Sequence, residues 1–154
     1  MPDEIKRTTL MVRDAERAAE WYATVFGMRR WFDSEFVLSD GQLAAGEIGD
    51  RTRLIIMQCK HERIGMIGLL QWLDPPRPAP DNLPAQLTFG APIFVVAAQD
   101  VRATTDRALA AGSRLHSSPH PWSVQGADGV TKHMIGASFW DLDGYFFEVN
   151  EVTR

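Results

Sequence analysis

The last part of the chain alternates apolar and polar residues in a pattern that predicts a β-hairpin. In the segment Ser138–Val152 (SFWDLDGYFFEVNEV), two aspartates and Gly144 supply the turn, because Asx side chains accept bonds from nearby amides and glycine tolerates positive φ. Because side chains alternate along the second strand, one of its faces carries Phe146, Glu148, Asn150 and Val152. A carboxylate buried among apolar neighbours needs a metal, a positive partner or a proton-transfer role, so Glu148 is a candidate site residue. The alternative is a salt-bridged or solvent-facing glutamate near a sheet edge.

Near the N-terminus, strand-like residues run directly into helical periodicity. Ile5 to Arg13 is rich in β-branched and apolar residues and ends at Asp14, which is typical of a helix N-cap. Apolar residues then recur at helical spacing to Phe26, and Gly27 is placed to end the helix. The pattern predicts a strand followed by a helix.

The same pattern occurs again after residue 90. A strand-like segment at residues 92–98 leads to Asp100 as N-cap, a helix continues through Leu109, and Gly112 follows its end. When Asp14 is aligned on Asp100, the closing glycines fall within one residue of each other. This repeat, with extended segments after each helix, predicts an α+β fold of two βαβββ modules.

The segments between the helices set the expected boundaries. Residues 28–60 break into short extended pieces and predict three strands, the last being LIIMQC. Residues 61–90 contain IGMIGLLQWL followed by the proline-rich DPPRPAPDNLP, and we interpret them as a connector. The expected organisation is one domain over residues 1–154, with modules at 1–60 and 91–154 joined by a connector at 61–90.

Composition limits the classes of partner. The 154 residues are 45% hydrophobic and 23% charged with a net charge of −4, as in an ordinary globular protein. No basic run extends beyond Arg29–Arg30, so no nucleic-acid partner is expected. Apolar stretches are too short to span a membrane, so no membrane association and a cytoplasmic location are expected. The single Cys59 is expected to be a small buried hydrophobe.

With these segments placed, the chain resembles the glyoxalase, bleomycin-resistance and extradiol-dioxygenase superfamily, also called vicinal oxygen chelate proteins. The resemblance rests on DAERAAEWYATVFGM, on AAQDVRATTDRALAAGSRL and on FWDLDGYFFEV, and it covers nearly the whole chain. It implies that the mixed sheets of the two modules curl into a cup-shaped pair of half-barrels. It also implies a small-molecule ligand, often a divalent metal on the floor of the cup, and a homodimer.

The family's metal ligands would fall at four positions of this chain. They are Arg7 and Ile93 in the first strands, and Gln58 (or Met57) and Glu148 in the last strands. Arginine and isoleucine offer no lone pair, and one amide with one carboxylate is a poor ligand set for Zn²⁺, Fe²⁺ or Ni²⁺. No metal or other cofactor is therefore expected. A non-standard divalent-metal site formed by His116, His133 and Glu148 is the weaker alternative. If the turn pairs Ala137 with Glu148, His133 lies four residues farther along the same strand, which is too far to share one ion with Glu148 directly.

Other residues are candidates for contact with a ligand. Arg7 could occupy the position of the missing metal, pair with Glu148 and hold a substrate oxygen, or form a purely structural salt bridge. The remaining candidates for the substrate-binding surface are Trp31, Gln58, Trp122, His133, Phe139 and Phe146, with core packing as the alternative for each aromatic residue.

Three functions remain open from the sequence. The protein could be a metal-independent isomerase or lyase, with Glu148 as general base and Arg7 stabilising an oxyanion. It could instead be a non-catalytic protein that sequesters an apolar or aromatic compound, as drug-binding members of the family do. A metal-dependent glyoxalase or dioxygenase with non-standard ligands is the third option. The identity of the substrate is not encoded in any of these residues.

Overall fold

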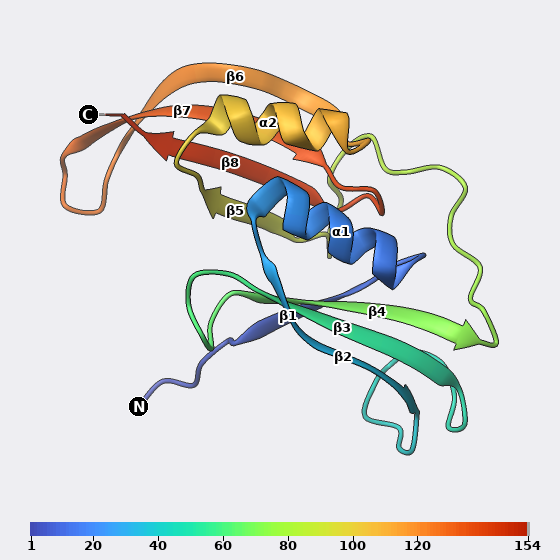
Figure 1. The fold of residues 1–154 in the computed structure, drawn as a ribbon. Coiled ribbons are helices and arrows are strands. Elements are labelled where there is room, and N and C mark those ends of the chain that lie inside the picture. The colour runs from blue at the N-terminus through green and yellow to red at the C-terminus, as the bar shows by residue number, and fades with distance from the viewer. Residues whose placement is uncertain (154) are drawn as a thin grey trace. The chain divides into compact units, whose positions relative to one another are not determined.

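Two units with the same order of elements make up the chain. The computed structural model describes residues 1–153, and the contacts between residues divide it into units of residues 1–82 and residues 83 onward (Figure 1). The first unit contains β1 (Arg7–Met11), α1 (Ala15–Phe26), β2 (Arg29–Val37), β3 (Arg51–Gln58) and β4 (Met66–Asp74). The second unit contains β5 (Ile93–Ala97), α2 (Val101–Ala110), β6 (Arg114–Gln125), β7 (Thr131–Trp140) and β8 (Phe146–Val152). The prediction of two βαβββ modules is confirmed.

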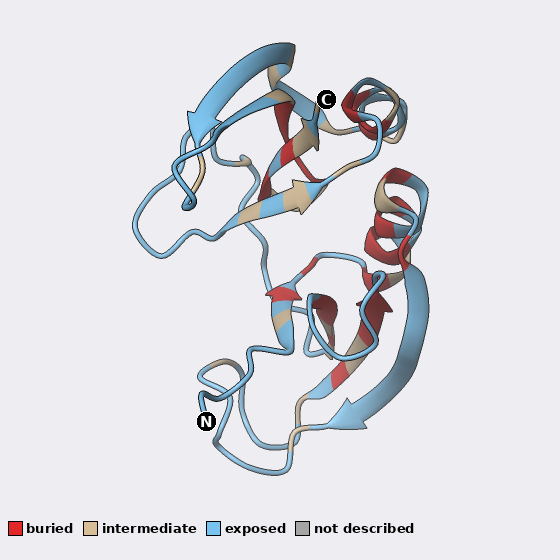
Figure 2. Cartoon of the chain, turned by 90° about the vertical axis from the view of Figure 1, so that its left-hand side faces the viewer, coloured by how far each residue is buried: buried red, intermediate tan, exposed pale blue. Residues whose placement is uncertain are grey.

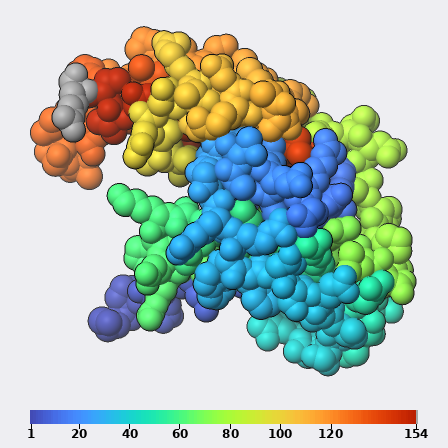
Figure 3. Space-filling view, in the orientation of Figure 1, coloured from blue at the N-terminus to red at the C-terminus, as the bar shows by residue number. Residues whose placement is uncertain are grey.

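Each unit has one mixed four-stranded sheet with equivalent strand orders, β1-β4-β3-β2 and β5-β8-β7-β6. The first strand pairs parallel to the last, and the other pairs are antiparallel. One helix packs on one face of each sheet, and in Figure 3 the atoms of α2 (yellow) lie directly against those of β6 (orange). In the second unit, the face opposite the helix carries a pocket and is open to a ligand. The pairing of the two sheets into a cup stays a prediction.

Helix ends form where the sequence predicts them. The Asp14 carboxylate accepts from the backbone N–H of Arg17 at 3.0 Å, and Gly27 ends α1 in the left-handed conformation at φ 67°. Asp100 caps α2 in the same way, accepting from the backbone N–H of Ala103 at 2.9 Å. A side-chain acceptor at this position satisfies one of the helix's unpaired N–H groups.

The predicted connector begins too early. Residues 66–74, inside the expected 61–90 connector, form β4, which lies between β1 and β3 in the first sheet. Residues 38–50 contain no strand, so the three strands after α1 are β2, β3 and β4 rather than three pieces within 28–60. A nearly continuous apolar run such as IGMIGLLQWL is what a strand buried on both faces requires, and β4 is buried over most of its length.

The core of each unit lies between its helix and its sheet. Buried positions, red in Figure 2, line the helices and the central strands, whereas β2 is exposed along its whole length. In the second unit the largest buried side chains on the helix-side face are Phe139, Phe147 and Val149. Within residues 1–153, no helix is long and apolar enough to cross a bilayer.

A network of ion pairs joins α1 to β2 and β3. The Glu16 carboxylate lies 2.6 Å from the guanidinium of Arg30 and 2.8 Å from that of Arg53, which also lies 2.8 Å from Asp33. Hydrogen bonds from Arg30, and next from Arg53, hold the pKa of Glu16 below its ordinary value. The hydrogen bond from Arg53 likewise lowers the pKa of Asp33. These charges fix the helix on the first sheet.

Candidate functional site

Glu148 lies in the middle of β8 and faces away from the helix-packed side of the second sheet. Its backbone pairs with Ser138 on β7 and with Val95 on β5. Its chain neighbours Phe147 and Val149 point to the opposite face, where both are buried. The expectation of a buried carboxylate is therefore wrong, because the apolar neighbours in sequence are not its neighbours in space. Glu148 is exposed, and its carboxylate has no hydrogen-bond or ion-pair partner among residues 83–153, the described part of its own unit.

The turn that precedes β8 has the predicted chemistry. The Asp141 carboxylate is buried and accepts from the backbone N–H groups of Asp143 at 2.9 Å and Tyr145 at 2.8 Å. Gly144 has a φ of 91°, which favours glycine. These contacts fix the register of β7 against β8 and so decide which side chains accompany Glu148.

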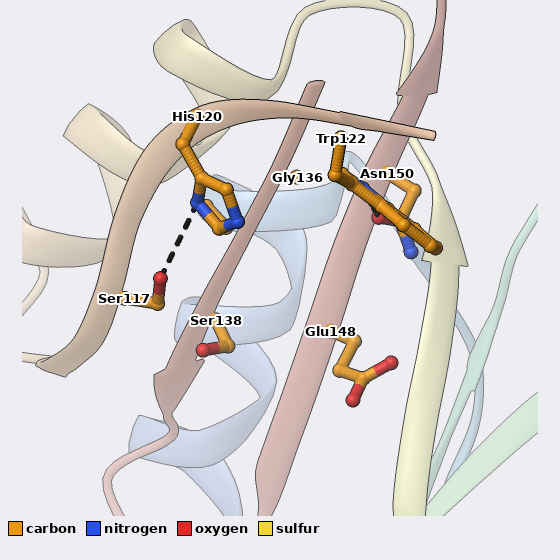
Figure 4. Close-up of a pocket in the computed structure, with 8 residues that line it drawn as sticks. Ser117, His120, Trp122, Gly136, Ser138, Glu148 and Asn150 are labelled. Atoms are coloured by element: carbon orange, nitrogen blue, oxygen red, sulfur yellow. Dashed lines mark hydrogen bonds between the residues drawn. The ribbon is translucent and has the colours of Figure 1, made fainter. Parts of the chain in front are cut away.

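A pocket of about 320 Å³ lies on the open face of the second sheet. Ligand pockets usually have volumes of about 300–1,000 Å³, so this one suits a small molecule. Three adjacent strands supply its lining, with side chains projecting from β6, β7 and β8 toward one region (Figure 4). The lining residues are Ser117, His120, Trp122, Gly136, Ala137, Ser138, Glu148 and Asn150.

One wall of the pocket is an indole that crosses the middle strand. Trp122 on β6 reaches over Gly136 on β7, and its Nε1–H donates to Oδ1 of Asn150 on β8 at 3.0 Å (Figure 4). A Cβ at Gly136 would lie only 2.6 Å from Nε1 of Trp122, so the crossing requires glycine there. The hydrogen bond fixes the indole while leaving Trp122 36% exposed, which provides an aromatic surface for a ligand.

His120 is held on the same side of the sheet. Its ring Nδ1 lies 2.8 Å from the backbone carbonyl oxygen of Ser118 and 3.4 Å from the hydroxyl of Ser117 (Figure 4). No pattern in the sequence singles out this histidine. β6 carries two prolines and two register shifts around it, so strand alternation could not be read through this segment. Asn150, in contrast, could have been found, because its spacing from Glu148 places it on the same face.

Three predicted residues of the second unit lie outside the pocket. The observed register pairs Ser138, not Ala137, with Glu148, so His133 is on the helix-side face and its Nδ1 lies 2.7 Å from the hydroxyl of Ser123. Phe139 is also on that face, fully buried beside Phe147, which makes it a core residue. Phe146 shares the face of Glu148 but is buried against Trp140 and His116. Of the aromatic candidates in this unit, only Trp122 lines the pocket.

The other predicted residues lie in the first unit. Arg7 is exposed on β1 and its Nε donates to the hydroxyl of Thr9 at 3.1 Å. Gln58 is buried, accepting from Nε of Arg29 at 2.7 Å and donating to the carbonyl oxygen of Glu62 at 2.7 Å. Trp31 is 57% exposed on β2. A pair between Arg7 and Glu148, and ligand contacts by Gln58 and Trp31, stay predictions.

The residues present do not fit the divalent metal that the resemblance implies. Both ends of the Gln58 amide are used by protein partners, Ile93 has no donor atom, and the nitrogens of Arg7 carry no available lone pair. Across residues 1–153, no three His, Cys, Asp or Glu side chains are grouped to hold a metal ion. The alternative site from His116, His133 and Glu148 is not formed, because His133 faces away from Glu148.

Comparison with known proteins agrees with this architecture. The family model described as Glyoxalase/Bleomycin resistance protein/Dioxygenase superfamily matches residues 4–149. None of the curated proteins compared with the chain matches it.

Solved structures from several bacteria share the fold. A glyoxalase family protein from Bacillus cereus has a TM-score of 0.76 at 12% identity, covering 98% of this chain and 95% of that one. The antibiotic binding protein TnmS3 from Streptomyces sp. CB03234 has a TM-score of 0.56 at 18% identity, covering 99% and 98%. The fosfomycin resistance protein FosX from Mesorhizobium loti has a TM-score of 0.53 at 17% identity, covering 97% and 91%. At these identities the similarity establishes the fold alone.

Proposed function

Because the chain belongs to the Glyoxalase/Bleomycin resistance protein/Dioxygenase superfamily, we propose that it binds a small, planar, partly apolar molecule in the pocket on β6, β7 and β8. The observation that carries the proposal is the indole of Trp122, fixed over Gly136 by its bond to Asn150 and still open to a ligand. An aromatic side chain that is already immobilised loses little conformational entropy when a ligand stacks on it. The antibiotic binding function of one protein with the same fold is in keeping with this role.

Titration calorimetry with a panel of planar aromatic compounds tests the proposal. We expect Trp122→Ala to weaken binding at least about fivefold, because stacking on an aromatic side chain contributes roughly 1 kcal/mol or more. Trp122→Phe keeps the ring but removes the N–H donor, and it should give an intermediate loss. Phe89→Ala is the control, since Phe89 is fully exposed and outside the pocket. Equal affinities for wild type and Trp122→Ala would refute the proposal.

A second candidate function is supported by the position of Glu148. Its carboxylate lines the pocket beside Ser138 and has no partner among the described residues of its own unit, so it is available to accept a proton from a bound substrate. A base in this position suits an isomerase or lyase that removes a proton next to a carbonyl group. This function requires the binding function and adds a chemical step to it.

Glu148→Gln separates the two candidates. For an enzyme, this substitution should abolish turnover of the carbonyl substrate while leaving its affinity within a few-fold. Asp106→Asn removes the same charge from the exposed side of α2 and should leave turnover unchanged. For a binding protein, no carbonyl compound bound by the wild type would be converted at all.

The predicted homodimer is also part of the proposal. Its support within the chain is the group of exposed aromatic side chains on β2, Trp31, Phe32 and Phe36, because apolar side chains that gather on an exposed strand often mark an interface. Light scattering coupled to size-exclusion chromatography should give twice the mass of the 17.3 kDa chain. A monomer at micromolar concentration would contradict this part of the proposal.

A further inference from the structure

We infer that the pocket of the second unit takes a neutral planar ligand with hydrogen-bond donors on two opposite edges, one donating to Nε2 of His120 and the other to the carboxylate of Glu148. The inference rests on the proposed binding function and specifies the class of ligand. It makes His120 a specificity-determining residue.

The tautomer of His120 follows from its backbone contact. Nδ1 lies 2.8 Å from the carbonyl oxygen of Ser118, and a carbonyl oxygen can only accept, so in the neutral ring the proton is on Nδ1. Nε2 then carries a lone pair and acts as an acceptor. The hydroxyl of Ser117 lies near Nδ1, not Nε2, and no residue of the described chain bonds to Nε2. The ring therefore presents an unused acceptor in the pocket lining.

The pocket lining contains a second unused acceptor, the carboxylate of Glu148. Glu148 adds two carboxylate oxygens that have no partner among residues 83–153, while the Oδ1 of Asn150 is already used by Trp122, which leaves its amide N–H groups as donors. Ser138 can donate or accept. Neither lysine nor arginine is among the lining residues, so an anionic ligand would meet the carboxylate of Glu148 without a compensating positive charge.

The strand order sets the separation of the two acceptors. His120 is on β6 and Glu148 on β8, with β7 between them, so their backbones are about 10 Å apart at the usual strand spacing. Because side chains stand roughly perpendicular to a sheet, the two acceptors stay well separated, and two donors on adjacent atoms of one ring could not reach both. Donors on opposite edges of a fused aromatic system could, while the plane of that system lies against the indole of Trp122.

Three matched compounds test the inference by titration calorimetry. They are 2,6-dihydroxynaphthalene with two donors, 2,6-dimethoxynaphthalene with the same ring and no donor, and naphthalene-2,6-dicarboxylate with two negative charges. We expect the diol to bind at least about tenfold more tightly than the dimethoxy compound, because it gains one neutral hydrogen bond and one to a carboxylate, and the dicarboxylate to bind most weakly. His120→Phe should reduce the preference for the diol several-fold, and so should Glu148→Leu.

His133→Phe is the matched control, because His133 is exposed on the opposite face of the same sheet. It should leave the preference unchanged. Nitrogen-15 correlation spectra of the histidine rings give a second readout. They are recorded on the wild-type protein, and a variant is needed only to assign the His120 signal. They should show the neutral ring of His120 protonated on Nδ1.

The outcomes distinguish this inference from the proposed function. Equal binding of diol and dimethoxy compound, with binding still dependent on Trp122, would overturn the inference and leave the proposed function standing. Tightest binding of the dicarboxylate, or a neutral His120 protonated on Nε2, would also overturn it. If none of the three compounds binds, and neither does any member of the wider planar panel, the proposed function fails as well.

Discussion

Replacing Gly136 by alanine would insert a methyl group where the indole of Trp122 crosses β7. The new Cβ would lie 2.6 Å from Nε1 of Trp122, 3.0 Å from its Cδ1 and 2.9 Å from Oδ1 of Asn150. These separations are shorter than van der Waals contact, so the indole must move away from Asn150. Gly136 does not have positive φ, and the substitution therefore acts through this collision and not through backbone strain.

The size of the effect can be worked out from three contributions. Loss of the hydrogen bond between Trp122 and Asn150 costs about 1 kcal/mol. Repacking around an added methyl group typically costs about 1–3 kcal/mol, here reduced because Trp122 is partly exposed. Alanine in a strand regains about 0.5–1 kcal/mol over glycine through lower backbone entropy in the unfolded chain. Gly136→Ala should therefore destabilise the second unit by about 1–2 kcal/mol.

The assay is a double-mutant cycle in which urea unfolding is measured for four proteins: wild type, Gly136→Ala, Trp122→Ala and the double variant. Without the indole the methyl group meets only the end of the Asn150 side chain, which can rotate. The alanine should then be neutral or slightly stabilising, so its effect changes sign between the two backgrounds. Gly41→Ala is the control, since Gly41 has open space around it and does not have positive φ. An equal cost of Gly136→Ala in both backgrounds would refute the crossing geometry.

Three further predictions concern charge and the hairpin turn. Arg53→Met removes the main cause of the lowered pKa of Asp33 and the second cause, after Arg30, of the lowered pKa of Glu16. The wild type should therefore be more stable than the variant above about pH 5, and the difference should close as the pH falls through the lowered folded-state pKa values, as measured by thermal unfolding across pH. Asp141→Ala leaves two backbone N–H groups of the turn without their acceptor and should cost about 1–3 kcal/mol in urea unfolding, with Asp141→Asn milder. Elemental analysis of the purified protein should find no stoichiometric metal, and a metal lost in Glu148→Ala would contradict the donor-set argument.

The sequence predicted the helices and the repeat because their signals are local. A cap aspartate, one amphipathic face and a closing glycine act within a few residues of each other, and both copies of this pattern fold as expected. The Asp141 turn was predictable for the same reason, since its donors are only two and four residues away.

β4 escaped prediction because one of its two partners is remote in the sequence and because it is buried on both faces. It pairs with β1, some sixty residues earlier in the chain, and with β3 on its other side. A strand between two neighbours and buried on both faces loses the alternation that identifies half-buried strands, and the prolines that follow suggested a connector.

The site shows how one residue of register decides which side chains meet. Pairing Ala137 with Glu148 would have placed His133 on the open face, whereas the observed pairing with Ser138 moves His133 and Phe139 to the helix side and brings Gly136 and Ser138 beside Glu148 and Asn150. The apolar pattern of β8 fixes which face Glu148 occupies, but only the turn geometry fixes which residue of β7 stands opposite it. Trp122 and His120 then depend on the shifted register of β6, which no local pattern reveals. Of the residues that line the pocket, only Glu148 and Trp122 were predicted from the sequence. The hydrogen bonds of Asp141 set which residues of β7 join them, and the shifted register of β6 sets the position of His120.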